Sequence, residues 1–217
     1  MIAYWIAYHG RLTAAFREHL LMLGITLFLS ILLSSGITIL IMERPRIARW
    51  VVRFFGAVYA IPSLALFAIL IPFLGIGMKT AITVLVFYNQ FPLIRNFLAG
   101  FNAIDPALIE AALGMGMTET RMLLRIKLPL AFPVIMAGIR LSIISTIGIA
   151  TIAAVINAGG LGVILFDGLR TLNAVKILWG TLLSGGLAVA ANALMMWLER
   201  LAAAKLHYDV HVKEPDD

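Results

Sequence analysis

The chain has 217 residues, of which 62% are hydrophobic and only 13% are charged, whereas soluble domains carry about 25% charged residues. So few charged groups, gathered at a few places, cannot cover a soluble surface, and the composition predicts an integral membrane protein. The net charge of +6 does not indicate a nucleic-acid partner, because the basic residues flank apolar stretches. The chain has no cysteine, which excludes disulfides and thiolate metal sites. Its four histidines are all near the termini, and we expect no metal site.

The first stretch, residues 1–19, has mixed polarity and carries Tyr4, Trp5 and Tyr8. It lacks the positive start and the small-residue cleavage site of a signal peptide, so we expect an interfacial N-terminal helix. Residues 20–42 carry no charge, and these 23 residues can cross a hydrocarbon core of about 30 Å at about 1.5 Å per residue. They form the first predicted span.

A loop with four arginines follows, and residues 54–78 form the second predicted span. Pro62 and Pro72 lie within this span, where prolines bend a membrane helix without forbidding it. Lys79 marks a tight turn, and residues 80–98 form the third span.

Residues 105–129 are the longest polar interruption of the chain. An ionisable side chain at the bilayer centre costs about 2.5 to 3.5 kcal/mol, so this stretch lies in water. Asp105 is a good helix N-cap and Pro106 suits the first helical position. Gly114 and Gly116 end that helix, and Thr118 can cap a second helix that runs back into the membrane.

Apolar sequence resumes at Leu130 and predicts a fourth span over residues 133–156. The glycine-rich residues 157–162 end this helix in a turn. Within the span, Arg140 is expected to extend toward the cytoplasmic interface. A fifth span covers residues 177–198. The membrane domain thus occupies residues 20–205, and residues 206–217 form a polar tail.

The distribution of Lys and Arg predicts the orientation of these five spans. Eleven lie in the first and third connections and the tail, five lie on the other side, and Arg140 lies within a span. The positive-inside rule therefore places the N-terminus outside, and the C-terminus and residues 105–129 in the cytoplasm.

Polar and irregular positions within the spans are candidates for a translocation path. They are Pro62 with Ser63, Asn89, and Asn157. For Asn89 the alternative is a hydrogen bond to a neighbouring helix, and for the prolines it is simple bending of packed helices. Glycines of the external turn, Gly159, Gly160 and Gly162, are candidates for an external gate, with an ordinary glycine-rich turn as the alternative. No GxxxxGK[ST] loop occurs, so the chain has no ATP site of its own.

The cytoplasmic stretch also carries a spaced motif. Glu110, Ala111 and Ala112 are followed by Gly116 after three residues, and then by Ile126 and the pair Leu128 and Pro129. This spacing resembles the signature of permease subunits of binding-protein-dependent ABC importers. The resemblance implies an all-α membrane protein of the methionine-importer type, with five core transmembrane helices and a cytoplasmic coupling helix between the third and fourth. It implies that Glu110, Ala111, Ala112 and Gly116 contact the ATPase and that Pro129 starts the helix that moves.

Further stretches narrow this resemblance. Residues 60–77 (AIPSLALFAILIPFLGIG), residues 109–118 (IEAALGMGMT) and the NAGGLG turn are similar to glycine betaine, carnitine and choline permeases. The implied partners are ATPase subunits that bind ATP and Mg, a second identical or paralogous permease, and an extracytoplasmic binding protein, all at the bacterial inner membrane. An amino acid or another small solute is the alternative substrate. A secondary transporter is a more remote alternative, because none of the five spans contains Asp or Glu.

Overall fold

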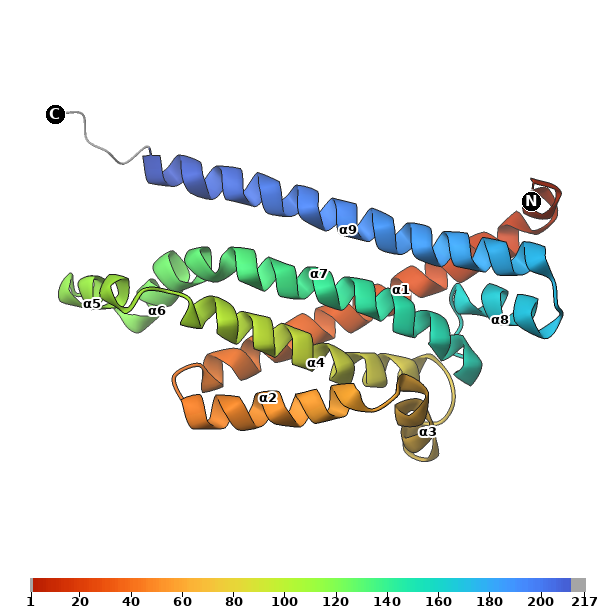
Figure 1. Cartoon of the computed structure of the whole chain (residues 1–217), viewed down its shortest axis with the longest axis horizontal. Coiled ribbons are helices and arrows are strands. Elements are labelled where there is room, and N and C mark those ends of the chain that lie inside the picture. The colour runs from red at the N-terminus through yellow and green to blue at the C-terminus, as the bar shows by residue number, and fades with distance from the viewer. Residues whose placement is uncertain (1, 212–217) are drawn as a thin grey trace.

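A computed structural model describes the backbone of residues 2–211 and the side chains of residues 4–202, and all elements in that part are helical. The elements are, in chain order, α1 (Ile2–Ile41), α2 (Pro45–Ala60), α3 (Ser63–Leu74), α4 (Met78–Asn102), α5 (Pro106–Gly114), α6 (Glu119–Met122), the π-helical turn η1 (Leu123–Lys127), α7 (Leu128–Ile152), the 3-10 turn η2 (Ala153–Ile156), α8 (Gly162–Arg170) and α9 (Ala174–His211). Figure 1 shows an elongated bundle with α5 and α6 at one end, and with α3, α8 and the N-terminus at the other.

Three helical stretches are long and apolar enough to cross a membrane. They are Tyr4–Ile41, Glu119–Ile156 and Ala174–Ala202. Two bent pairs, α2 with α3 and α4 with α5, pass the same criterion when each pair is taken together. The predicted all-helical membrane protein is therefore confirmed.

The first helix is longer than the sequence predicted. α1 continues through residue 19, where the sequence predicted the boundary between an interfacial segment and the first span, and has a kink at Tyr8 (φ −129°, ψ 16°). Leu12 and Ala15 are buried against Leu161 and Ile164 of the α8 region. Residues 4–19 therefore belong to the bundle. At the other end of the chain, α9 continues through His211 into the predicted tail, and residues 212–217 lie outside the described part.

Residues 54–78, the predicted second span, cover the second part of α2, all of α3 and the turn that leads to α4. The axes of α2 and α3 meet at 96°. Pro62 lacks an N–H group and disfavours helical geometry at the residue before it, and Ile61 is extended (φ −70°, ψ 131°). Pro72 lies inside α3 without breaking it. The break places α3 across the end of the bundle (Figure 1).

The helix α4 is the centre of the bundle and packs against both α1 and α7. Its buried Val84 and Leu85 share a core cluster with Phe67 of α3 and Ala150 of α7. Further along the same interface, a Cβ atom on Gly138 would lie 2.6 Å from the Cβ of Asn96. Small residues allow such close approach of membrane helices, and this contact gives Gly138 a packing role.

Polar side chains also join the helices. Asn89 of α4 is only 2% exposed. Its amide donates to Thr146 of α7 at 2.8 Å and to Ser30 of α1 at 3.3 Å. Arg140 of α7 forms an ion pair with Glu199 of α9, with 3.4 Å between the guanidinium and the carboxylate. The expectation that Arg140 extends toward the cytoplasmic interface stays a prediction.

The predicted fourth span begins earlier than residue 133. The chain is helical from Glu119, passes through the π-helical turn η1, and continues into α7. Pro129 at the start of α7 offers no N–H group to the carbonyl four residues before it, and a π-helical turn accommodates this loss. At the far end α7 gives way to η2, which ends at Ile156, where the sequence predicted the end of the helix.

Candidate functional site

The helix α5 begins as the sequence predicted. Asp105 is its N-cap, and the carboxylate accepts a hydrogen bond from the Ala107 N–H at 2.9 Å. Pro106 occupies the first turn. At the other end Gly116 adopts φ +75°, and the Met117 N–H donates to the Ala112 carbonyl at 3.1 Å. This left-handed glycine ends the helix and reverses the chain.

The helix α5 exposes several large apolar side chains on its surface. Glu110 and Ala111 are exposed, whereas Ala112 is fully buried. Leu108 and Leu113 are about half exposed, and Met115 is 75% exposed. Within the described side chains Glu110 makes no ion pair. A projecting helix that exposes apolar side chains around one free carboxylate is suited to contact another protein. The sequence motif does not include Leu108, Leu113 and Met115. Their exposure in the structure makes them candidate contact residues.

The rest of the motif lies on the arm that leads back into the bundle. Thr118 has the extended geometry of an N-cap, but its side chain makes no capping hydrogen bond. Ile126 lies in η1, and Leu128 and Pro129 begin α7. Lys127 forms an ion pair with Glu43 of the α1–α2 connection at 3.5 Å. The arm is thus helical from Glu119 into α7 and is tied to the neighbouring connection.

The glycine-rich turn lies at the opposite end of the bundle. Asn157, Gly159 and Gly160 all have positive φ (58°, 81° and 78°). The Gly160 N–H donates to the carboxylate of Glu18 at 3.0 Å, and the Leu161 N–H donates to Nδ1 of His19 at 3.4 Å. The turn is therefore fastened to α1. This geometry fits the alternative of a packed glycine-rich turn, and the role of His19 was missed because its partner lies 142 residues away.

A pocket of about 490 Å³ opens beside this turn, between Asn157, Arg11 and the α8 residues Asp167 and Arg170. The Asp167 carboxylate lies 2.9 Å from Lys176, 3.3 Å from Arg170 and 3.6 Å from Arg11. The hydrogen bond from Lys176 lowers the pKa of Asp167 below its ordinary value, and the neighbouring cations add to the shift. Asp167 therefore stays ionised and joins α1, α8 and α9 at the mouth of the pocket.

Pro62 and Ser63 lie at the break between α2 and α3. The Tyr88 hydroxyl donates to the Ile61 carbonyl, which the break leaves without a helical partner. The rings of Tyr88 and Tyr59 lie 5.5 Å apart, and those of Tyr59 and Phe91 lie 5.3 Å apart. An aromatic cluster thus adjoins the break, although no pattern in the sequence pointed to its members.

The candidate residues fall into separate groups. The motif residues on α5 and its arm are at one end, and Pro62, Ser63, Asn157 and the glycines of the turn are at the other. Phe67 of α3 and Ala158 of the turn belong to the same buried core cluster, so the members of the second group lie near each other. Asn89 lies apart from both groups, in the interior of the subunit, where it joins three helices. Among the described residues, no three His, Asp or Glu side chains gather as a metal site.

These features define a helical bundle with helices long and apolar enough to cross a membrane, and with a helix at one end that exposes apolar side chains. Residues 27–208 match the family described as "Binding-protein-dependent transport system inner membrane component". The chain therefore belongs to this family and is the permease component of an ABC importer, as its motif predicted.

Individual relatives extend over most of the chain. The carnitine transport permease protein OpuCD of Listeria monocytogenes is 34% identical over 186 residues, which cover 85% of this chain and 83% of the relative. The glycine betaine/carnitine/choline transport system permease protein OpuCD of Bacillus subtilis is 36% identical over 192 residues, with coverages of 88% and 84%. The predicted narrower resemblance to this group of permeases is confirmed.

Solved structures share the fold at lower sequence identity. An inward-facing MetNI methionine ABC transporter has a chain that matches with a TM-score of 0.82 at 22% identity, covering 90% of this chain and 98% of that chain. The likeness supports the predicted methionine-importer-type fold. At this identity the comparison concerns the fold and does not indicate the substrate.

Proposed function

We propose that this permease forms the path for a small quaternary-ammonium osmoprotectant, such as glycine betaine, choline or carnitine. The observation that carries the proposal is the identity of 34% and 36% to permeases named for these solutes, which extends over at least 85% of the chain. The break at Pro62 and Ser63, with Asn157 near it, lines the path. The partly exposed Tyr59 beside the break offers an aromatic face, which attracts a quaternary ammonium cation.

The proposed assembly contains two permease subunits, ATPase subunits that bind ATP and Mg, and an extracytoplasmic binding protein. The α5 helix docks on the ATPase through Glu110, Ala111, Ala112 and Gly116. Ile126, Leu128 and Pro129 lie on the arm that carries the motion to α7. In this assembly five core spans are formed by α1, by α2 with α3, by α4, by α7 with its arm, and by α9.

The orientation places the N-terminus outside the bacterial inner membrane and the C-terminus in the cytoplasm. It is supported by the basic residues near α5. In this orientation the turn with Gly159, Gly160 and Gly162 lies outside. Its contacts with Glu18 and His19 allow it to act as an external gate only if α1 moves with it.

The test is ATP-dependent uptake of labelled choline by proteoliposomes that contain the complete importer and its binding protein. We expect unlabelled glycine betaine or carnitine to compete, and methionine not to compete. ATP-dependent uptake of methionine without choline uptake would establish the amino-acid alternative. Uptake that needs an ion gradient and no ATP would establish a secondary transporter. Omitting ATP from the same vesicles is the control.

A further inference from the structure

A second pocket lies at the end of the bundle that carries α5. It has a volume of about 680 Å³ and is formed by the start of α2, the last turns of α4 and the end of α1. Its polar lining contains three arginines, Arg49 and Arg53 from α2 and Arg95 from α4. Apolar side chains, including Val52 and Leu98, form the rest of its wall. The pocket therefore combines three positively charged side chains with an apolar wall.

The charge of this pocket is not neutralised within the subunit. No carboxylate lines the pocket, and none of the three arginines takes part in an ion pair among the described side chains. Glu43, which precedes α2, is paired with Lys127. Three guanidinium groups around one cavity repel each other, so an anion bound between them would be stabilised by all three.

Aromatic rings hold two of these guanidinium groups. Arg53 lies over the ring of Trp50, and Arg95 lies over the ring of Phe91, each 5.8 Å from the ring centroid. Such contacts orient the planar group and leave its N–H donors at the edge. Planar guanidinium groups with free N–H donors match the oxygens of a phosphate.

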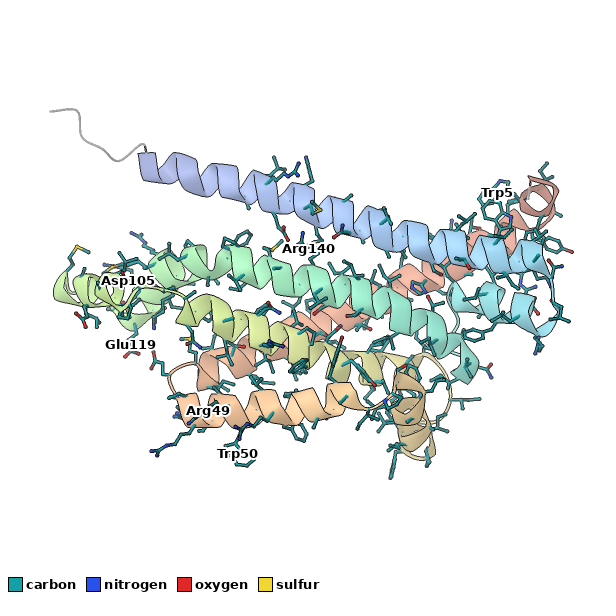
Figure 2. The ribbon with its side chains drawn as sticks, in the orientation of Figure 1. Trp5, Arg49, Trp50, Asp105, Glu119 and Arg140 are labelled. Atoms are coloured by element: carbon teal, nitrogen blue, oxygen red, sulfur yellow. The ribbon has the colours of Figure 1, made fainter. Side chains whose placement is uncertain are left out.

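The surroundings of the pocket resemble a membrane interface. Trp50 is 71% exposed on α2, close to Arg49 (Figure 2). Tryptophan is enriched at the headgroup level of membranes. Beyond Trp50 the exposed surface of α2 continues with Phe54, and α2 contains no further basic residue after Arg53. A molecule with an anionic head and an apolar tail could therefore place its head at the arginines and its tail along the apolar surface of α2.

We propose that this pocket binds the phosphate of an anionic phospholipid from the membrane leaflet on the α5 side. Arg49, Arg53 and Arg95 hold the headgroup, and the acyl chains lie along the exposed apolar surface of α2. Basic pockets between membrane helices are suited to such headgroups. A free phosphate has the same anionic chemistry, but it would leave the adjoining apolar surface uncovered. The site is independent of the transported solute and requires only that α2 and α4 lie in a membrane.

The test compares the purified importer complex with two triple variants. One variant, Arg49→Gln/Arg53→Gln/Arg95→Gln, removes the arginines of the pocket. The matched control removes three exposed arginines at the same end that do not line it, Arg46→Gln/Arg121→Gln/Arg125→Gln. Each complex is mixed with equal amounts of phosphatidylglycerol and phosphatidylcholine with identical acyl chains. The lipids that the complex retains are then measured by native mass spectrometry.

We expect the unmodified complex to retain phosphatidylglycerol in preference to phosphatidylcholine. The pocket variant should lose this preference by about tenfold, and the control should keep it within about twofold. A variant with lysine at all three positions keeps the charge and should retain part of the preference, which separates lost binding from lost folding. If the glutamine variant does not assemble, Arg95→Gln alone is measured in its place.

Four results would overturn the proposal. If the pocket variant and the control lost the preference for phosphatidylglycerol equally, the preference would arise from general surface charge and not from the pocket. Equal retention of the two lipids by the unmodified complex would exclude headgroup selection. Displacement of phosphatidylglycerol by excess inorganic phosphate alone would assign the pocket to a soluble anion. Retention only after removal of the ATPase subunits would assign it to the protein interface.

Discussion

Replacing Glu110 by alanine should reduce ATP-dependent uptake at least about tenfold while the protein remains folded in the membrane. The side chain has no ionic partner within the described part of the subunit, so its removal costs little stability. If the carboxylate pairs with a basic group of the ATPase in a water-excluded contact, its loss leaves that group buried and unpaired. Uptake and ATP hydrolysis are measured in the same proteoliposomes, and hydrolysis should continue without transport.

Glu119→Ala is the matched control for this substitution. Glu119 is an exposed carboxylate in the first turn of α6, further along the chain. Its removal should leave uptake within about twofold, because a surface charge near a helix N-terminus contributes about 0.3 to 1 kcal/mol to stability and the motif gives it no docking role. Full transport by Glu110→Ala, or equal losses in both variants, would contradict the coupling role of Glu110.

Replacing Gly162 by alanine should destabilise the protein by at least about 3 kcal/mol. A Cβ atom at this position would overlap the backbone carbonyl oxygen of Thr151 and lie 2.8 Å from the Cβ of Ala154. Neither group can move as the end of a flexible side chain could, so α8 would have to separate from the end of α7. Thermal unfolding of the purified protein in detergent measures the loss.

Gly148→Ala is the control for Gly162→Ala. Gly148 lies in α7, near the Thr151 carbonyl that Gly162 approaches. A Cβ atom added at Gly148 would meet no neighbouring side chain or helix within 4 Å. Alanine in a helix interior is favoured over glycine by about 0.5 to 1 kcal/mol, so this variant should be at least as stable as the original protein. If Gly162→Ala unfolds at the original temperature but no longer transports, the packing explanation is wrong and a gate is favoured.

Local sequence determined much of the architecture before any contact was known. Uncharged runs predicted the long helices, and the cap at Asp105 and the left-handed Gly116 were predictable because both depend on a few neighbouring residues. The spaced motif around Glu110 identified the family. Each of these features depends only on residues that are close together in the sequence, so the sequence alone can predict it.

Features that depend on distant residues were not predictable from single stretches. His19 lies near the N-terminus in the sequence, yet it is fully buried because α1 packs against the turn at Leu161. Arg140 finds Glu199 only after α7 and α9 come together. A proline such as Pro62 predicts a bend but not its angle, which here is 96° between α2 and α3. Pro72 is chemically the same and leaves its helix intact.

The most direct test of the central claim, that α5 is the contact through which an ATPase drives this importer, is cross-linking from a single cysteine. The chain has none of its own, so Met115→Cys at the end of α5 places one at a side chain that is 75% exposed. Leu172→Cys, at a side chain that is 90% exposed between α8 and α9, is the control. In membranes that contain the complete importer, a short bifunctional maleimide should join position 115 to the ATPase subunit and leave position 172 unjoined. A cross-link from position 172 to the ATPase, or none from position 115, would contradict the claim.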